Sequence, residues 1–180
     1  LTSQSYRQYS EAVCLQIRTH FPQLAALRTA FCWPIHNEPD LRPLMCDWIC
    51  AGHPAFSALL PVVVGRDQAL AFRPWTPDTP LFTDTYGIPT PTAGKFVQPQ
   101  AILLPVNAFD ASGFRIGYGG GYFDRTLAEL TPRPLLVGVG FALACVETTY
   151  PQAHDVRLDA VVTESGVLRF TADAPLDHAG

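Results

Sequence analysis

The segment AILLPVNAFDASGFRIGYGGGYFDRTLAEL, residues 101–130, concentrates more unusual chemistry than any other part of the chain. Residues 101–106 form an apolar run short enough for a buried strand, and a turn is expected at residues 110–113. Residues 115–121 are rich in glycine, and residues 122–130 have the spacing of a helix. A strand, a glycine-rich turn and a helix N-terminus can together bind an anion. Glycine lets a phosphate approach the backbone, and the first helical N–H groups have no internal partner.

The spacing of these glycines matches neither of two familiar nucleotide-binding motifs. It is not the dinucleotide-binding fingerprint, and no Gly-Lys-Ser/Thr follows as in a Walker A loop. A tight turn without a ligand is the alternative interpretation. However, Arg115, Asp124 and Arg125 flank the glycines, and Tyr118 and Tyr122 lie among them. This mixture of residues favours a site for a nucleotide phosphate with a metal.

Composition limits the class of protein. A chain of 180 residues and 19.7 kDa suits one domain, residues 1–180, with its own core. The net charge is −4 and Lys95 is the only lysine among twelve cations, so we expect no nucleic-acid partner. No apolar run reaches membrane-spanning length and no signal peptide is visible, which predicts a cytoplasmic protein without a membrane partner. The chain begins with Leu1 instead of methionine, so we expect its natural start upstream.

The five cysteines are odd in number and scattered along the chain. Cys46 and Cys50 lie one helical turn apart, a spacing that suits a metal or a redox pair. No second pair of ligands accompanies them. We therefore expect the cysteines to be buried free thiols of a cytoplasmic protein.

The remaining chain alternates between predicted helices and strands. Helical spacing predicts helices at residues 3–20 and 41–51, the second closed by Gly52. Apolar runs predict further strands at residues 29–35, 56–64, 69–73, 135–141, 160–163 and 166–170. The second and third of these can pair as a hairpin, residues 74–99 are expected to be a long loop, and residues 171–180 a flexible tail. Strands that alternate with helices predict an α/β layered fold with a mostly parallel sheet.

Three motifs in this chain resemble those of the 5-formyltetrahydrofolate cyclo-ligase family, also called methenyltetrahydrofolate synthetase. The family pattern P-x-x-(A/G)-F-D-x-x-G-x-R-L-G-x-G-x-G-Y-Y-D is matched by Pro105, Ala108, Phe109, Asp110, Gly113, Arg115, Ile116, Gly117, Gly119, Gly121, Tyr122, Phe123 and Asp124. Residues 155–161 (DVRLDAV) match a second family segment, D-x-x-(L/V)-D-x-(V/I), and residues 86–89 (YGIP) a third, G-I-P. The resemblance therefore covers nearly the whole chain.

The resemblance implies a fold and a reaction. The fold is a three-layer α/β/α sandwich with a mostly parallel sheet, similar to ribose-5-phosphate isomerase and CoA-transferase domains. The reaction is the ATP- and Mg²⁺-dependent cyclisation of 5-formyltetrahydrofolate, free or polyglutamylated, to 5,10-methenyltetrahydrofolate, with release of ADP and phosphate. We expect a monomer. Two alternatives stay open: a degenerate member that binds folate or nucleotide without turnover, and another transferase activity on the same scaffold.

The resemblance also assigns residues to the ATP site, with Arg115 and Tyr122 as catalytic residues. The residues expected to bind ATP are Arg115, Gly117, Tyr118, Gly119, Gly120, Gly121, Tyr122 and Phe123. Arg115 would place positive charge at the phosphates, although a salt bridge to Asp110 is an alternative role. Phe123 lacks the hydroxyl common at its position in the family. Tyr118 stands where some relatives have an arginine.

Metal and folate ligands follow from the same match. Asp124 and Asp155 correspond to the Mg²⁺ ligands of the family, although Asp124 can instead cap the helix that follows. Glu38 corresponds to a glutamate that touches the folate, where it can accept hydrogen bonds from the pterin; a solvated turn carboxylate is the alternative. Trp33 either stacks on the pterin or lies in the core, and Tyr122 is expected to contact the substrate as well.

The family's first helix carries a K-x-x-x-R segment whose cations meet the ATP phosphates, and this chain shows no counterpart. Leu1-Thr2-Ser3 aligns after that segment. Either the segment precedes Leu1, or ATP turnover has been lost. The absence of an initial methionine favours the first explanation.

Overall fold

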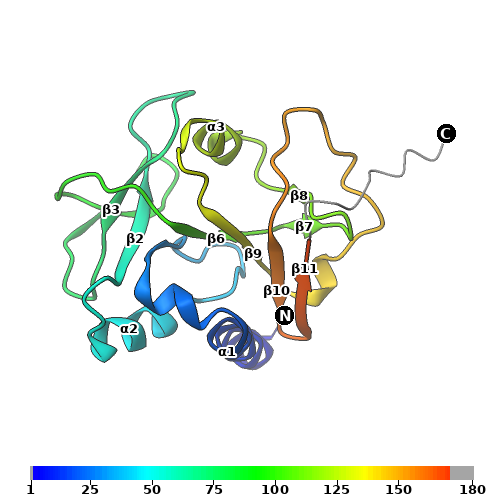
Figure 1. Ribbon diagram of the computed structural model, residues 1–180, viewed down its shortest axis with the longest axis horizontal. Helices are drawn as coiled ribbons and strands as arrows, with labels where there is room; N and C mark the ends of the chain where they lie inside the picture. The colour runs from blue at the N-terminus through cyan, green and yellow to red at the C-terminus, as the bar shows by residue number, and fades with distance from the viewer. Residues whose placement is uncertain (1, 171–180) are drawn as a thin grey trace.

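The computed structural model describes residues 2–170, which form three layers. A central sheet lies between α1 (Ser3–His20) and α2 (Arg42–Ala51) on one face and α3 (Tyr122–Glu129) on the other (Figure 1). Within the described residues the sheet has seven strands, in the order β11-β10-β9-β6-β1-β2-β3. Neighbouring strands are parallel except at the two edges, where β11 and β3 are antiparallel to their neighbours. The predicted three-layer α/β fold is confirmed.

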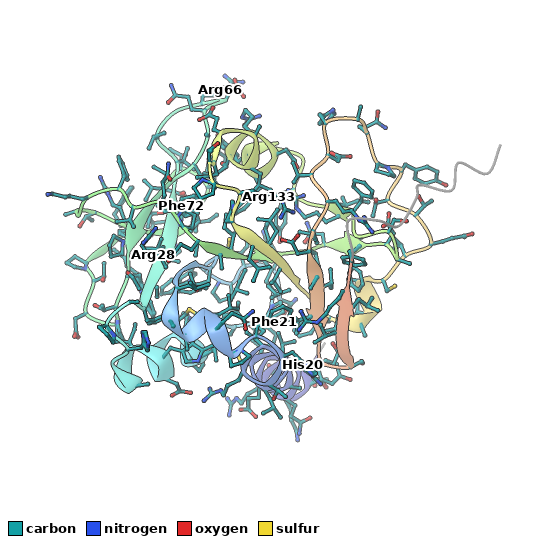
Figure 2. The ribbon with its side chains drawn as sticks, viewed as in Figure 1. His20, Phe21, Arg28, Arg66, Phe72 and Arg133 are labelled. Atoms are coloured by element: carbon teal, nitrogen blue, oxygen red, sulfur yellow. The ribbon has the colours of Figure 1, made fainter. Side chains whose placement is uncertain are left out.

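The helices and the strands of the main sheet occur in the predicted order. The strands of the main sheet are β1 (Arg28–Ala30), β2 (Ser57–Val62), β3 (Ala71–Pro74), β6 (Ala101–Pro105), β9 (Leu135–Val139), β10 (Ala160–Thr163) and β11 (Gly166–Arg169). Two 3₁₀ helices, η1 and η2, span Pro22–Ala26 and Ala142–Ala144. As predicted, β2 and β3 pair antiparallel. Arg66 lies at the outer tip of the segment that joins them (Figure 2).

The core is divided in two by the sheet. Leu60 and Leu103 belong to the half that packs against α1 and α2, whereas Leu59 and Ile102 belong to the half beneath α3. Consecutive strand residues face opposite sides of a sheet, so strands covered on both faces are apolar at every position. This explains the unbroken apolar runs of the sequence. In Figure 2, Phe21 lies between α1 and the sheet, within the first half of the core.

Two predictions of secondary structure were wrong in detail, and one hairpin was not predicted. Residues 74–99 are not a featureless loop, because β4 (Leu81–Thr83) pairs with β5 (Pro89–Pro91) as a hairpin. A second hairpin, β7 (Ala108–Phe109) with β8 (Arg115–Ile116), surrounds the predicted turn at residues 110–113. The first strand ends at Ala30 instead of extending to residue 35. Such short strands give no periodic signal. The predicted tail, residues 171–180, lies outside the described residues.

All five cysteines are free, as predicted, but they are not all buried. Burial raises the pKa of the Cys14 thiol to about 12. Cys50 and Cys145 are exposed, which corrects the prediction for both. Within residues 2–170 there is no helix of the length and apolar character needed to cross a membrane.

Candidate active site

The glycine loop, residues 117–121, joins β8 to the N-terminus of α3. Gly119 and Gly121 adopt the left-handed backbone conformation, with φ of 79° and 63°, which glycine tolerates without strain. A Cβ atom on Gly117 or Gly119 would have no neighbour within 4 Å. The loop is therefore open on its outer side, as a loop that admits a phosphate has to be.

Adjacent parallel strands bring this loop to the predicted folate residues. β1 and β6 are neighbours and run parallel, so their carboxyl ends lie at the same edge of the sheet. The chain leaves β1 toward Trp33 and Glu38, and leaves β6 toward the β7–β8 hairpin and the glycine loop. Ligands of open α/β sheets bind outside the carboxyl ends of the strands, where these segments meet.

Glu38 is buried, with 8% of its surface exposed, so the alternative of a solvated turn carboxylate is wrong. One carboxylate oxygen, Oε2, accepts a hydrogen bond from the Ile35 N–H at 3.0 Å. The other, Oε1, accepts one from the Tyr118 hydroxyl at 2.8 Å. Burial raises the pKa of Glu38 above its usual value, although these two hydrogen bonds and the neighbouring His36 oppose that rise. A residue of the predicted folate site thus contacts the glycine loop directly.

The side chain of Arg115 is nearly covered, with 6% of it exposed. Its Nη2 lies 3.0 Å from Asp124 Oδ1, and its Nη1 donates to the Val156 carbonyl oxygen at 3.2 Å. The alternative partner, Asp110, instead accepts hydrogen bonds from Ser112, Phe114 and Thr149. Arg115 therefore links α3 to the segment that contains Asp155.

The two predicted metal ligands keep partly exposed carboxylates. Asp124 lies in the first turn of α3 and is 29% exposed, and the side chain does not cap the helix, so the capping alternative is wrong. Asp155 is 26% exposed, and its Oδ2 accepts a hydrogen bond from the Gln152 N–H at 2.6 Å. No group of three or more His, Cys, Asp or Glu side chains within residues 2–170 is arranged to hold a metal by itself. Two carboxylates fit a Mg²⁺ ion that keeps waters and phosphate oxygens in its coordination shell.

Tyr122 belongs to a group of side chains that the sequence predicted only in part. Its hydroxyl lies 2.7 Å from the hydroxyl of Tyr86, which raises the pKa of Tyr122. The Arg125 guanidinium covers the Tyr122 ring at 4.9 Å and donates to the Gly120 carbonyl oxygen. Tyr86, on the turn between β4 and β5, was not predicted as a site residue. Its only sequence signal is its place directly before Gly87 in the G-I-P segment.

Trp33 is half-buried and packs against the core. This position is compatible with both predicted roles, stacking on the pterin and packing in the core. The Arg42 guanidinium lies 4.7 Å from the centre of the Trp33 ring, and Trp75 meets its edge at 6.3 Å. Asp40 holds Arg42 through two side-chain hydrogen bonds of 2.8 and 2.7 Å. The orientation of Trp33 is therefore fixed by packing.

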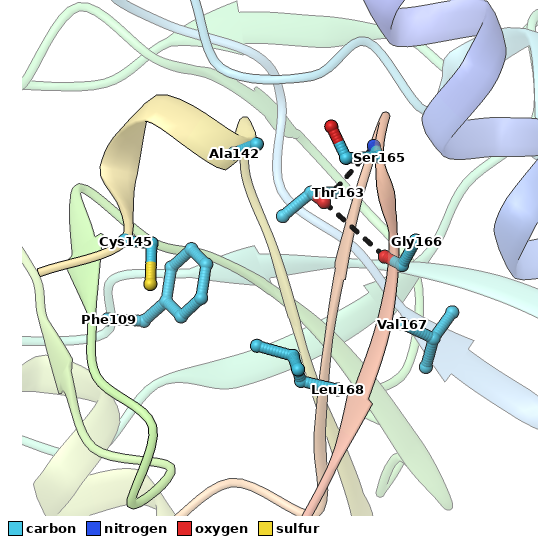
Figure 3. Close-up of a pocket in the computed structure, with 8 residues that line it drawn as sticks. All are labelled: Phe109, Ala142, Cys145, Thr163, Ser165, Gly166, Val167 and Leu168. Carbon is cyan, nitrogen blue, oxygen red and sulfur yellow. Dashed lines mark hydrogen bonds between the residues drawn. The ribbon is translucent and has the colours of Figure 1, made fainter.

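A cavity of about 280 Å³ lies elsewhere, under the turn between β10 and β11 (Figure 3). Phe109, Cys145 and Leu168 contribute to its largely apolar wall, and the hydroxyl of Thr163 is bonded to the turn itself. None of the predicted site residues lines it. The candidate site is thus the open edge of the sheet and not this cavity.

Known proteins that are similar to this chain support the family that its motifs resemble. The model of the 5-formyltetrahydrofolate cyclo-ligase family matches residues 10–164. The 5-formyltetrahydrofolate cyclo-ligase of Escherichia coli K12 is 29% identical over 93% of this chain and 94% of its own length. The solved structure of Aquifex aeolicus 5,10-methenyltetrahydrofolate synthetase has a TM-score of 0.81 at 29% identity and covers 99% of this chain and 90% of that one. The Mycoplasma pneumoniae synthetase, at 17% identity, shares the fold with a TM-score of 0.71 over 91% of this chain and 90% of its own. The chain therefore belongs to the 5-formyltetrahydrofolate cyclo-ligase family of enzymes.

Proposed function

We propose that this chain converts 5-formyltetrahydrofolate to 5,10-methenyltetrahydrofolate in a reaction that requires ATP and Mg²⁺ and releases ADP and phosphate. The observation that carries the proposal is the contact between Glu38 and the glycine loop. A residue suited to the folate ring and a loop suited to phosphate lie within one hydrogen bond of each other. Transfer of a phosphoryl group between two substrates requires this proximity.

At the ATP end, the chain contributes charge and backbone donors. The glycine loop, residues 117–121, leads into the N-terminus of α3, and a Cβ atom at Gly117 or Gly119 would meet no atom within 4 Å. Arg115 is held by Asp124 and the Val156 carbonyl oxygen, so its guanidinium is already desolvated and fixed. A fixed cation stabilises developing charge on phosphate oxygens without reorganisation during the reaction.

Asp124 and Asp155 are the residues that would hold Mg²⁺ in this site. The ion supplies neutralisation of phosphate charge when it is bound. Because Arg115 bonds both Asp124 and the residue after Asp155, it keeps the two acidic segments together before any ligand arrives. These two contacts support this function of Arg115.

At the folate end, Glu38 accepts hydrogen bonds from the amino and ring N–H groups of the pterin, while Trp33 and Tyr122 supply aromatic surface. The formyl oxygen at N5 attacks the γ-phosphorus of ATP, and the bond from that phosphorus to the ADP oxygen breaks. N10 then attacks the activated formyl carbon and closes the ring. Loss of the N10 proton to solvent and departure of phosphate give the methenyl product. The chain supplies alignment and charge in this sequence, and no covalent bond forms to the protein.

The test is an assay of the protein with 5-formyltetrahydrofolate, ATP and Mg²⁺. We expect the absorbance of the methenyl product to appear together with ADP in equal amounts. Asp124→Asn should lower turnover by a hundredfold or more, on the order expected for loss of a charge that stabilises the transition state, and should change folate binding little. Asp47→Asn is the matched control, because Asp47 is an exposed aspartate of α2 whose partner is Arg18.

The possible results of this assay distinguish turnover from binding without turnover, and a role in the reaction from structural damage. Folate binding without either product would contradict the proposal and indicate a member of the family that binds without turnover. Equal loss of turnover and folate binding in Asp124→Asn would contradict the role assigned to Asp124 and indicate structural damage.

A further inference from the structure

The contact between Tyr118 and Glu38 joins segments that lie 80 residues apart and serve different ligands in the proposed reaction. Glu38 is 8% exposed, whereas Tyr118 is 57% exposed and touches the carboxylate with its hydroxyl. The Tyr118 ring also lies against His36, with the ring centres 5.9 Å apart. Tyr118 therefore lies across the carboxylate that a pterin has to reach.

The backbone on either side of Tyr118 is glycine and has open space beside it. Gly117 and Gly119 flank the residue, and neither position has an atom within 4 Å of where a Cβ would stand. Glycine carries the largest conformational freedom of any residue. Tyr118 is held through its side chain: its ring lies against His36, and its hydroxyl bonds Glu38 and also interacts with Asn107. The bond to Glu38 connects this end of the glycine loop to the predicted folate site.

We propose that Tyr118 is a positioning residue that couples the two halves of the site. Its hydroxyl holds the glycine loop against Glu38 while the folate site is empty, and the N–H groups of an arriving pterin displace it. The loop is then released to close on the phosphates of ATP. This coupling rests on the proposed function, because it requires a pterin at Glu38 and a nucleotide at the loop.

An arriving pterin has to compete for the Glu38 carboxylate with the hydrogen-bond donors that already occupy it. The carboxylate is bonded at both oxygens, to the Ile35 N–H and to the Tyr118 hydroxyl. The Ile35 donor belongs to the same turn as Glu38 and cannot leave without unfolding that turn. The Tyr118 donor comes from the glycine loop, 80 residues away in sequence, and can leave without unfolding the turn that contains Glu38. A hydrogen bond to a charged group corresponds to about tenfold or more in an equilibrium constant, so breaking it weakens pterin binding by that order.

The groups that face Glu38 come from several segments. His36 favours the charged carboxylate, and Cys32 lies close enough for Glu38 to raise the pKa of its thiol, after burial as the larger cause. Tyr6 of α1 donates its hydroxyl to the backbone carbonyl oxygen of Glu38 at 3.0 Å, and not to the carboxylate. Tyr118 alone among these is both bonded to the carboxylate and part of the glycine loop. This makes Tyr6→Phe the matched control for Tyr118→Phe, since each variant removes one tyrosine hydroxyl next to Glu38.

The first measurement is hydrogen–deuterium exchange of the ligand-free protein over residues 111–123. We expect faster exchange of the glycine loop in Tyr118→Phe than in wild type, and wild-type exchange in Tyr6→Phe. Addition of 5-formyltetrahydrofolate should raise loop exchange in the wild type toward that of Tyr118→Phe.

The second measurement is the affinity for 5-formyltetrahydrofolate without nucleotide, as a function of pH. Tyr118→Phe should bind about tenfold more tightly at pH 7, because no bond has to be broken. Its binding should also be lost at a higher pH on the acid side than in wild type. The Tyr118 hydroxyl lowers the pKa of Glu38, and its removal raises that pKa further. Tyr6→Phe should show neither change.

The outcomes separate this coupling from the proposed function. Wild-type protein that binds no folate at any pH contradicts the proposed function, whatever the loop does. Wild-type protein that binds folate, with Tyr118→Phe indistinguishable from Tyr6→Phe or weaker in affinity, overturns the coupling and leaves the proposed function standing.

Discussion

At the scale of single residues, Glu38 illustrates a conflict between ligand binding and the stability of the fold. A buried carboxylate is costly when it is ionised, and Glu38 is nearly covered. Its pKa is raised because burial outweighs the hydrogen bonds from Ile35 and Tyr118. Such a group stabilises the fold fully only below its unfolded pKa, and that contribution is lost as the pH rises through the raised folded value. At neutral pH Glu38 is therefore a cost to the fold that we attribute to ligand binding.

Glu38→Gln tests this attribution. The glutamine carbonyl can accept from Ile35 while its amide donates to the Tyr118 oxygen, so both hydrogen bonds survive without charge. We expect affinity for 5-formyltetrahydrofolate to fall about tenfold to a hundredfold, as for loss of hydrogen bonds to a charged acceptor. We expect the free energy of unfolding at pH 7 to stay the same or rise, measured by urea denaturation. Glu147→Gln, at an exposed position, is the control and should change neither quantity. A large loss of stability in Glu38→Gln would contradict the account.

At the scale of elements, the short helix α3 depends on its surroundings more than on its sequence. It has eight residues, fewer than an isolated helix needs to be stable in water, and its N-cap residue, Gly121, provides no side-chain cap. Thr126 lies within it, 1% exposed. The Thr126 hydroxyl accepts a hydrogen bond from the Leu70 N–H at 2.8 Å and donates to the Tyr122 carbonyl oxygen at 2.6 Å. One side chain thus fixes α3, and with it Tyr122 and Asp124, to the strand region around Leu70.

Thr126→Val keeps the shape of the side chain and removes both hydrogen bonds. The partly buried Leu70 N–H then loses its acceptor, and we expect the free energy of unfolding to fall by about 1–3 kcal/mol. Urea denaturation measures this change. Thr19→Val in α1 is the control, because Thr19 is exposed and substitutions of that kind change stability by less than about 0.5 kcal/mol. A loss in Thr126→Val no larger than in this control would contradict the role of Thr126.

At the scale of the whole molecule, Asp110 connects distant segments. It is 3% exposed and accepts hydrogen bonds from Ser112 and Phe114 in its own turn and from Thr149, 39 residues later. Burial acts to raise the pKa of Asp110, but the hydrogen bonds from Thr149, Phe114 and Ser112 outweigh it and lower the pKa. A carboxylate with a lowered pKa stabilises the fold above its unfolded pKa, and this contribution is lost as the pH falls through the folded value.

Asp110→Asn should therefore reveal an acid-dependent part of the stability. At pH 7 we expect a loss of about 1–3 kcal/mol in the free energy of unfolding, because an amide accepts at only one of its two ends. Below the unfolded pKa of about 3.9 the wild type loses this advantage, and the difference between the two proteins should shrink. Urea denaturation at pH 7 and pH 3 measures both points. Asp78→Asn, at an exposed position, is the control; an equal difference at both pH values would rule out the linkage.

Elements with a clear local sequence pattern were the most predictable part of this fold. The helix at residues 3–20 and the strand at residues 160–163 have the predicted bounds, and Gly52 ends α2 in the left-handed conformation with φ of 70°. These features depend on local periodicity and on backbone conformation, and both are determined by residues that are neighbours in the sequence. The hairpins β4–β5 and β7–β8 have strands of three residues or fewer, too short for a periodic signal, and their turns are closed by hydrogen bonds to the side chains of Asp84 and Asp110.

The sequence by itself determined the layered α/β fold and the glycine loop, because periodicity and residue type are local properties, and its resemblance to a family supplied the list of candidate residues. Only the tertiary structure decided their partners: Arg115 with Asp124 instead of Asp110, Tyr86 with Tyr122, and Tyr118 with a buried Glu38. The physical reason is the parallel pairing of β1 with β6. It places the carboxyl ends of two strands, 70 residues apart in sequence, at one edge of the sheet, and no local pattern records that adjacency.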